Sequence, residues 1–232
     1  MKILSSILFL LTSACAFGQY YYISPNALGG ILNNPTITIG SGTNVTTFSA
    51  TYPLPVATGT NTVWDDLRIA DGQIRGGATA PSLATFGPSG TLRTYQFSAT
   101  TLQEVEFAIQ MPHDWAEGTA LHPHVHWAPT TTDTNRVVWG FEYSWANIAA
   151  TFGASTTLLI TNYTGGTAWK HNIHEFSADI AGTGKTFSSI LVCRLFRDAT
   201  SGSDDYPDAA AFLEFDIHYE RNSLGSRDEY VK

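Results

Sequence analysis

The stretch AFLEFDIHY, from Ala211 to Tyr219, alternates strictly between two sets of side chains. One set is Phe212, Glu214, Asp216 and His218, and the other is Leu213, Phe215, Ile217 and Tyr219. Successive side chains of a β-strand point to opposite faces of the sheet, so this alternation predicts a strand with one polar and one apolar face. Such a strand must bury its apolar face against a second layer.

Seven other short segments also have the composition of strands. The clearest is residues 104–110, where Val105, Phe107 and Ile109 share one face. The others are residues 91–97, 122–127, 136–145, 156–160, 171–176 and 188–196. Turn residues separate the segments, and no sustained helical period occurs, although a short helical turn is expected within residues 144–152. The sequence therefore predicts an all-β protein, an antiparallel β-sandwich or jelly roll, with an extended N-terminal arm.

The first residues resemble a targeting signal. Lys2 precedes an apolar run over residues 3–11, and small residues follow up to Gly18. This pattern predicts a secretory signal peptide over residues 1–18 and a secreted, extracellular or cell-surface location. The apolar run is shorter than the roughly 20 residues that span a bilayer, so no transmembrane segment is expected in the mature chain. Residues 11–15 approximate a lipobox that would lipidate Cys15, but Thr12 stands where an aliphatic residue is usual.

Composition divides the rest of the chain. Residues 24–62 contain no Lys, Arg, Asp or Glu. We expect residues 19–62 to form an extended arm that docks on a neighbouring subunit, a small β-region, or a flexible linker. Residues 63–222 are predicted to form the β-sandwich domain, and residues 223–232 a polar C-terminal tail.

Charge and cysteine content exclude several classes of protein. The formal net charge is −8 and the basic residues form no stripe, so nucleic acid is not an expected partner. Charged residues make up 14% of the chain, against about 25% in an average soluble domain, which is typical of proteins in extracellular assemblies. Cys193 lies in an apolar segment and is expected to be a buried thiol, so core packing must hold the fold.

The segment HPHVHW, residues 122–127, is the strongest candidate site. In a strand, His122, His124 and His126 share a face at intervals of about 7 Å. An H-x-H pair is a recognised metal-ligand spacing, and imidazole suits Zn or Fe. Four more histidines can add ligands from other segments: His113, His171, His174 and His218.

Three arrangements of these histidines remain open. In a trimer, an H-x-H pair from each copy can surround one metal ion on the three-fold axis. In a single jelly roll, Gly118, His124, His126, Asp133 and Gly140 are similar to the first cupin motif, but the Glu expected after the second histidine is missing. The histidines can also satisfy hydrogen bonds at a polar interior or a subunit interface without any metal.

Two further sites are predicted on weaker patterns. Asp204, Asp205 and Asp208 can form a calcium-binding loop, although they lack the spacing of an EF-hand and can equally form a solvated acidic loop. Trp115 and Trp169 lie in expected loops, where an indole can stack on a sugar.

Four segments carry a resemblance to a known group of proteins. They are VWDDLR at residues 63–68, QMPHDWAEGT at 110–119, HPHVHW at 122–127 and LEFDIHY at 213–219. Together they resemble uncharacterised structural proteins of tailed-phage and prophage virions. The resemblance implies a virion component without enzymatic activity. The predicted signal peptide departs from it, because phage virion proteins assemble in the cytoplasm.

The sequence therefore favours a non-enzymatic structural or surface-assembly protein, secreted or displayed on a virion if a phage encodes it. It is expected to form a homo-oligomer, with a trimer favoured, and to have a cell-surface or glycan partner. One alternative is a secreted, metal-dependent, cupin-like jelly-roll enzyme. A second alternative is a carbohydrate-binding module.

Overall fold

The computed structural model describes residues 21–23, 36–41, 44–49, 56–58, 62–88, 90–226 and 228–230. The predicted signal peptide, Cys15 and the end of the polar tail lie outside these residues. Within the described part of the chain, no helix is both long and apolar enough to cross a membrane.

The described residues fall into two compact units. The first contains those before Trp64, together with residues 112–116 and those after Tyr219. Its strands form a four-stranded antiparallel sheet in chain order: β1 (Tyr21–Ile23), β2 (Thr36–Ser41), β3 (Asn44–Ser49) and β4 (Val56–Thr58). The stretch for which an arm, a β-region or a linker was expected therefore contains β-structure.

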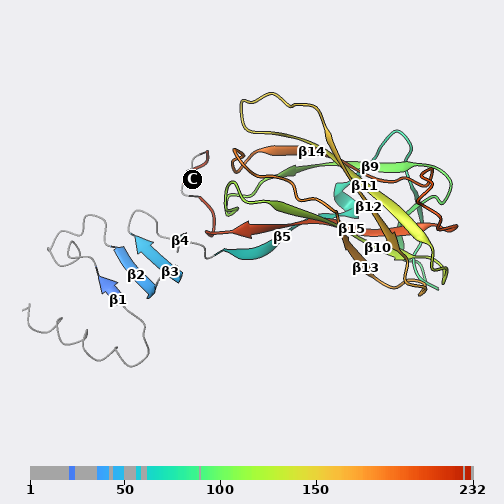
Figure 1. Ribbon diagram of the computed structural model, residues 1–232, viewed down its shortest axis with the longest axis horizontal. Helices are drawn as coiled ribbons and strands as arrows, with labels where there is room; N and C mark the ends of the chain where they lie inside the picture. The colour runs from blue at the N-terminus through green and yellow to red at the C-terminus, as the bar shows by residue number, and fades with distance from the viewer. Residues whose placement is uncertain are drawn as a thin grey trace, which may run out of the picture. The chain divides into compact units, whose positions relative to one another are not determined.

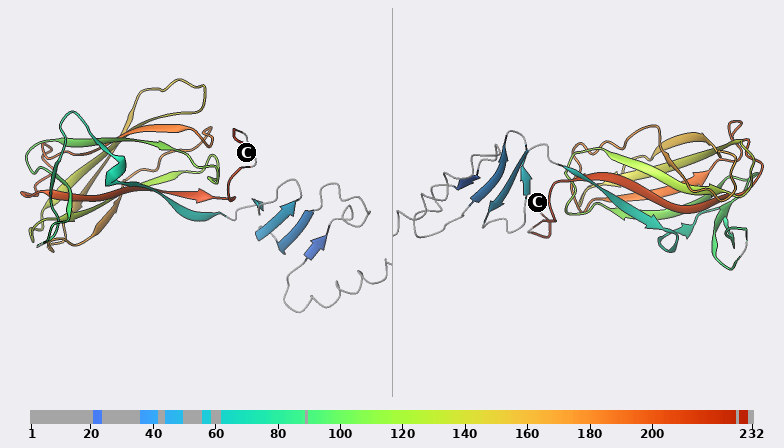
Figure 2. Two further views of the ribbon diagram at one scale, coloured as in Figure 1. Left: turned by 180° about the vertical axis from the view of Figure 1, so that it is seen from behind. Right: turned by 90° about the horizontal axis from the view of Figure 1, so that it is seen from below.

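The second unit is a sandwich of two antiparallel sheets, as the sequence predicted (Figure 1). One sheet has the order β13 (Asn172–Glu175), β10 (Leu121–Pro129), β15 (Ala210–Arg221), β8 (Arg93–Phe97) and β7 (Ser82–Thr85). Strand β5 (Val63–Ala70) also pairs with β15, and the right-hand view of Figure 2 shows the two side by side. The other sheet has the order β12 (Thr156–Tyr163), β11 (Arg136–Ala146), β14 (Ile190–Arg197), β9 (Gln103–Gln110) and β6 (Arg75–Gly76).

All eight predicted strands are present, within a few residues of the expected bounds. Strands β5, β6 and β7 were not predicted, because their side chains are mostly exposed and lack an apolar period. The expected helical turn within residues 144–152 is absent, since β11 continues to Ala146 and a turn follows. A 3-10 turn lies instead at Asp71–Gln73.

Aromatic side chains fill the space between the two sheets. Phe215 of β15 stacks on Phe141 of β11, with ring centroids 4.6 Å apart, and also contacts Phe107 of β9 at 5.2 Å. Phe97 and Trp139 extend this packing with an edge-to-face contact at 5.0 Å. Each such side chain buries about 150–250 Å², so aromatic burial is the main force that joins the sheets.

The predicted buried thiol is also present. Cys193 is free and 3% exposed, and burial raises the pKa of its thiol. A neutral, inert thiol in this position contributes packing, as expected for a small apolar side chain.

A β-bulge corrects the predicted faces of β15. His126 of β10 lies opposite Glu214, but the next residue, Trp127, lies opposite Phe212, which leaves Leu213 as the extra residue. A bulge reverses the alternation beyond it. Phe212 was predicted to share the polar face, but it is fully buried and contacts Phe97 in the core.

Candidate metal centre

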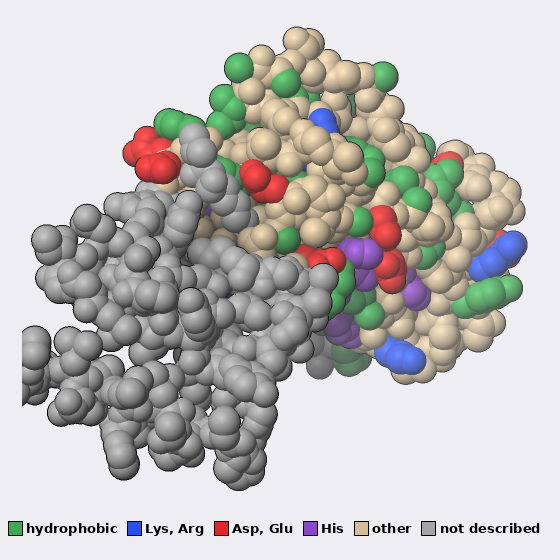
Figure 3. Space-filling model, turned by 60° about the vertical axis from the view of Figure 1, so that its left-hand side comes forward, with side chains coloured by type: hydrophobic (Ala, Val, Ile, Leu, Met, Phe, Trp, Pro, Cys, Tyr) green, Lys and Arg blue, Asp and Glu red, His purple; other side chains and the backbone are tan. Residues whose placement is uncertain are grey.

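The histidines of β10 lie on the outer face of their sheet. Val125 lies opposite Phe215 of β15, and both are fully buried in the core. Residues directly opposite each other in an antiparallel pair point to the same face, and neighbours along a strand point to the other face. His122, His124 and His126 therefore point away from the core, and Figure 3 shows histidine side chains gathered beside acidic ones on the surface.

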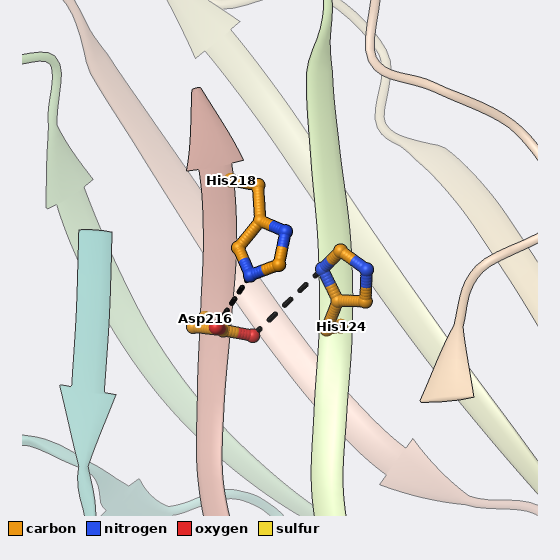
Figure 4. Close-up of side chains that lie close together, drawn as sticks. All are labelled: His124, Asp216 and His218. Atoms are coloured by element: carbon orange, nitrogen blue, oxygen red, sulfur yellow. Dashed lines mark ion pairs between the residues drawn. The ribbon is translucent and has the colours of Figure 1, made fainter. Parts of the chain in front are cut away.

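Three side chains from β10 and β15 form what we call the metal centre: His124, Asp216 and His218 (Figure 4). One ligand atom from each lies within 4.8 Å of the other two. Asp216 Oδ1 is 3.9 Å from His124 Nδ1, and Asp216 Oδ2 is 3.3 Å from His218 Nε2. The register produces this arrangement, because it sets His124 directly opposite Asp216, while His218 follows two residues along the same face.

Two further groups border the metal centre. His126 Nε2 lies 3.3 Å from Asp216 Oδ1, and Asp66 of β5 places its Oδ1 atom 3.2 Å from His218 Nε2. Each of these residues is a candidate fourth ligand, although neither belongs to the set whose atoms all lie within 4.8 Å.

Buried polar atoms in the metal centre lack hydrogen-bond partners. The side chains of His124 and Asp216 are 9% and 5% exposed, respectively. Three buried atoms make no hydrogen bond: His124 Nδ1, His126 Nε2 and Asp216 Oδ1. An unsatisfied buried polar atom costs about 1–3 kcal/mol, so three together in one place require an explanation. A cation held by His124, Asp216 and His218 would compensate the His124 and Asp216 atoms.

The separations suit a metal ion of tetrahedral geometry. Zn–N and Zn–O bonds of about 2.0–2.1 Å place neighbouring ligand atoms about 3.3–3.4 Å apart. Asp216 Oδ1 lies 3.3 Å from His126 Nε2, and the other oxygen, Oδ2, lies 3.3 Å from His218 Nε2. The separation between Asp216 Oδ1 and His124 Nδ1 is longer, at 3.9 Å.

The surroundings shift the pKa values of His124 and His126 in opposite directions. Burial lowers the pKa of His124, and the neighbouring His218 lowers it further. Both effects favour the neutral imidazole, which is the form that binds a metal. The interaction with Asp216, at hydrogen-bonding distance but poorly aligned, raises the pKa of His126.

The other predicted histidines lie in different environments. His122 is outside the metal centre and contacts Asp179 and Glu175. His171 Nε2 lies 2.7 Å from His126 Nδ1, so His171 contacts a residue that borders the metal centre. His113 belongs to the first unit, where it contacts Ser226.

His174 faces the core side of the sheet and is not a ligand. It lies opposite Val125, and its Nδ1 accepts a hydrogen bond of 3.0 Å from the indole of Trp127. Burial lowers the pKa of His174 to about 4. This neutral imidazole serves to satisfy a buried indole.

Sequence reasoning placed Asp216 on the same face as His218 but did not identify it as a ligand. The available signal was the D-x-H spacing of residues 216–218 on a strand with strict alternation. Strand pairing could not be read from the sequence, so the position of Asp216 opposite His124 was not predicted.

The cupin-like arrangement is not found among the described residues. His124 and His126 lie on the outer face of their sheet, the space between the sheets is filled by aromatic side chains, and Asp133 does not join the histidines. Asp133 caps a turn by accepting a hydrogen bond of 2.8 Å from the Asn135 amide.

The predicted calcium loop is also not formed. The Asp204 carboxylate accepts two hydrogen bonds from the Arg197 guanidinium, from Nε at 2.9 Å and from Nη2 at 2.8 Å. The side chains of Arg197 and Asp204 are fully buried. Asp205 is bound by Arg136, and Asp208 accepts a hydrogen bond of 2.8 Å from Thr131 Oγ1. The three carboxylates do not form a set within 4.8 Å of one another, because each is held by a different partner.

Of the two tryptophans proposed to stack on sugars, Trp115 is fully buried and cannot do so. Trp169 is partly buried and packs edge-on against Phe86 at 5.2 Å. The exposed indole is instead that of Trp64, which is 59% exposed and lies edge-on to His122 at 5.0 Å. Trp64 was not among the residues predicted to stack on a sugar.

Comparison with known proteins assigns no family to the chain. No protein-family model and no curated protein sequence matches it. Among solved structures, a CBM35 from Cellvibrio japonicus Abf62 is 9% identical, with a TM-score of 0.37, over 66% of this chain and 92% of that one.

Two other solved structures have similar scores. The CBM22-2 xylan-binding domain of Paenibacillus barcinonensis Xyn10C is 14% identical, with a TM-score of 0.38, over 67% of this chain and 98% of that one. A structure of infectious bursal disease virus, Gx strain, is 9% identical, with a TM-score of 0.37, over 83% of this chain and 43% of that one. Likenesses at this level carry no argument about function, which must come from the site.

The buried Arg197–Asp204 pair generates a test of the fold. Arg197→Met leaves the Asp204 carboxylate buried without its partner, which costs about 3–5 kcal/mol. We expect urea unfolding to show a loss of this size in the free energy of unfolding. The matched control, Arg136→Met, removes the exposed partner of Asp205 and should change stability little. Equal stability of the two variants would contradict a structural role for the loop.

Proposed function

We propose that this chain is a non-catalytic structural module of a secreted or virion surface assembly, stabilised by a transition-metal ion at the metal centre. One observation carries the proposal. Asp216 Oδ1 and His124 Nδ1 are buried without hydrogen bonds, 3.9 Å apart, beside the imidazole of His218. A bound cation would offset the cost of burying these groups, in addition to the ion pairs that Asp216 makes with His126 and His218 at 3.3 Å.

The donor set favours zinc in a structural role. Two imidazoles and one carboxylate suit Zn or Fe. Structural zinc sites are closed by four protein ligands, and His126 can supply the fourth, since its Nε2 already lies 3.3 Å from Asp216 Oδ1. If His126 does not bind, the same three ligands leave open positions, as in iron enzymes with two histidines and one carboxylate. That outcome supports the alternative of a metal-dependent enzyme.

The expected stoichiometry follows from where the ligands lie. His124, Asp216 and His218 belong to one chain, so a metal ion does not need histidines from three copies. We therefore expect one ion per chain, whatever the oligomeric state. An ion that binds only the folded chain stabilises it by about 2.7 kcal/mol at a concentration of one hundred times Kd.

Assembly into a homo-oligomer is part of this proposal. Its support is the low charge of the chain and the apolar side chains that β12 exposes at the edge of the five-stranded sheet, Leu159 and Tyr163. The measurement of absolute mass in solution tests it.

Removal of Asp216 tests the metal centre. In Asp216→Asn, the anionic ligand is lost, so we expect the zinc content by elemental analysis to fall from about one ion per chain to near zero. The thermal midpoint of the wild type should fall on addition of a chelator, whereas that of the variant should not respond. The matched control is Glu214→Gln on the same strand, which loses a carboxylate paired with Arg68 and should keep its zinc.

Each alternative to this result has a clear meaning. About one-third of an ion per chain in a trimer would support a shared site on a three-fold axis. A wild-type chain that takes up no zinc, or an Asp216→Asn variant that keeps it, would refute the metal centre.

A second candidate function, glycan binding, is favoured by the exposed indole of Trp64. This side chain packs edge-on against the imidazole of His122, with the ring centroids 5.0 Å apart. A flat aromatic surface next to carboxylates and imidazoles offers both stacking and hydrogen bonds to a sugar ring.

The test of this second function is a screen of immobilised glycans. We expect Trp64→Ala to lose any binding seen with the wild type, because the stacking surface is removed. Tyr163→Ala, which removes another exposed aromatic side chain, should bind like the wild type. Binding that persists in Trp64→Ala would exclude Trp64 as the stacking residue.

A further inference from the structure

A second group of metal-ligating side chains lies beside the metal centre on the same outer face. We call it the outer cluster, and it consists of His122, Glu175 and Asp179. His122 Nδ1 is 2.9 Å from Asp179 Oδ1 and 3.5 Å from Glu175 Oε1. One ligand atom from each residue lies within 4.8 Å of the other two, as in the metal centre.

The backbone holds the outer cluster in place. Glu175 lies at the end of β13, directly opposite His124. Asp179 follows in a short loop whose two ends are attached to β10. At the first end the Phe176 amide donates to the Pro123 carbonyl at 3.0 Å, and at the second the Leu121 and Ile180 backbones exchange two hydrogen bonds at 2.9 and 3.0 Å. Ligands on such a fixed frame need little reorganisation to bind an ion.

The buried His124 connects the outer cluster with the metal centre. Its Nδ1 faces Asp216, whereas its Nε2 faces Glu175 Oε2 at 3.9 Å, which is too long for a hydrogen bond. Glu175 therefore points one oxygen toward His122 and the other toward His124. The Nδ1 atom that lacks a hydrogen bond faces Asp216 and so belongs to the metal centre, while the Nε2 side of the same buried ring faces the outer cluster.

The surroundings of the outer cluster are acidic. Glu175 and Asp179 are 55% and 49% exposed, and the ion pairs they form within the described chain are with histidines, not with Lys or Arg. Their two carboxylates therefore leave a local negative charge that a divalent cation can neutralise.

We propose that His122, Glu175 and Asp179 bind a second divalent cation, of the harder Mn²⁺ type, next to the first. One imidazole and two carboxylates, half exposed to solvent, suit an octahedral ion that keeps several waters. The metal centre, with two imidazoles and one buried carboxylate, suits zinc. The outer face of the sheet then carries two unlike ions separated by the His124 ring.

Manganese binding to the wild-type chain, loaded beforehand with one equivalent of zinc, tests this site. The electron paramagnetic resonance signal of free Mn²⁺ reports how much manganese is bound. We expect one Mn²⁺ per wild-type chain and binding at least tenfold weaker in Asp179→Asn, because even changes around a ligand cost about 10–100-fold. Asp198→Asn carries the same charge change in a distant loop and should bind like the wild type.

The readouts separate the two sites. Asp179→Asn should keep its zinc, and Asp216→Asn should lose zinc but still bind Mn²⁺. Glu175→Gln serves as the second variant if Asp179→Asn unfolds, and the same loss is expected. No manganese bound to the wild type, or equal binding in Asp179→Asn and the wild type, would refute the second site, whatever the zinc content shows.

Discussion

The antiparallel pairing of β10 with β15 determines both the core and the candidate site. One register places Val125 and Phe215 in the core and, on the opposite face, sets His124 against Asp216. A slip by one residue would turn every side chain of a strand to the other face. The burial of Phe215 against Phe141 and Phe107 is therefore also what holds the imidazoles and carboxylates together.

The bulge at Leu213 lets β15 carry polar side chains on its outer face along one part and bury Phe212 in the core along the other. On one side of it, the outer face carries acidic and imidazole groups as far as Glu214, and on the other side Phe212 turns into the core. Without the extra residue, strict alternation would place either Phe212 in the polar cluster or Asp216 in the aromatic core. Each arrangement is costly, because it exposes a large apolar side chain or buries a charge without a partner.

The sequence predicted the fold well because period-two alternation directly reports a half-buried strand. It missed β5, β6 and β7, whose side chains are mostly exposed, and the face of Phe212, which depends on a bulge with no sequence signal. For the site, it identified His124 and His218, each on its own strand. Asp216 becomes a partner of these histidines, and Trp64 a neighbour of His122, only through strand pairing, which a single sequence does not specify.

A metal ion on the outer face of a sheet acts differently from one inside a jelly roll. The aromatic core already joins the two layers, so the proposed ion is not needed to create the fold. It instead compensates the buried Asp216 carboxylate, whose Oδ1 atom has no hydrogen-bond donor. The proposed ion would lie at the surface, since His218 remains about one-third exposed. An ion in this position would therefore also change the charge of the outer face of the sheet.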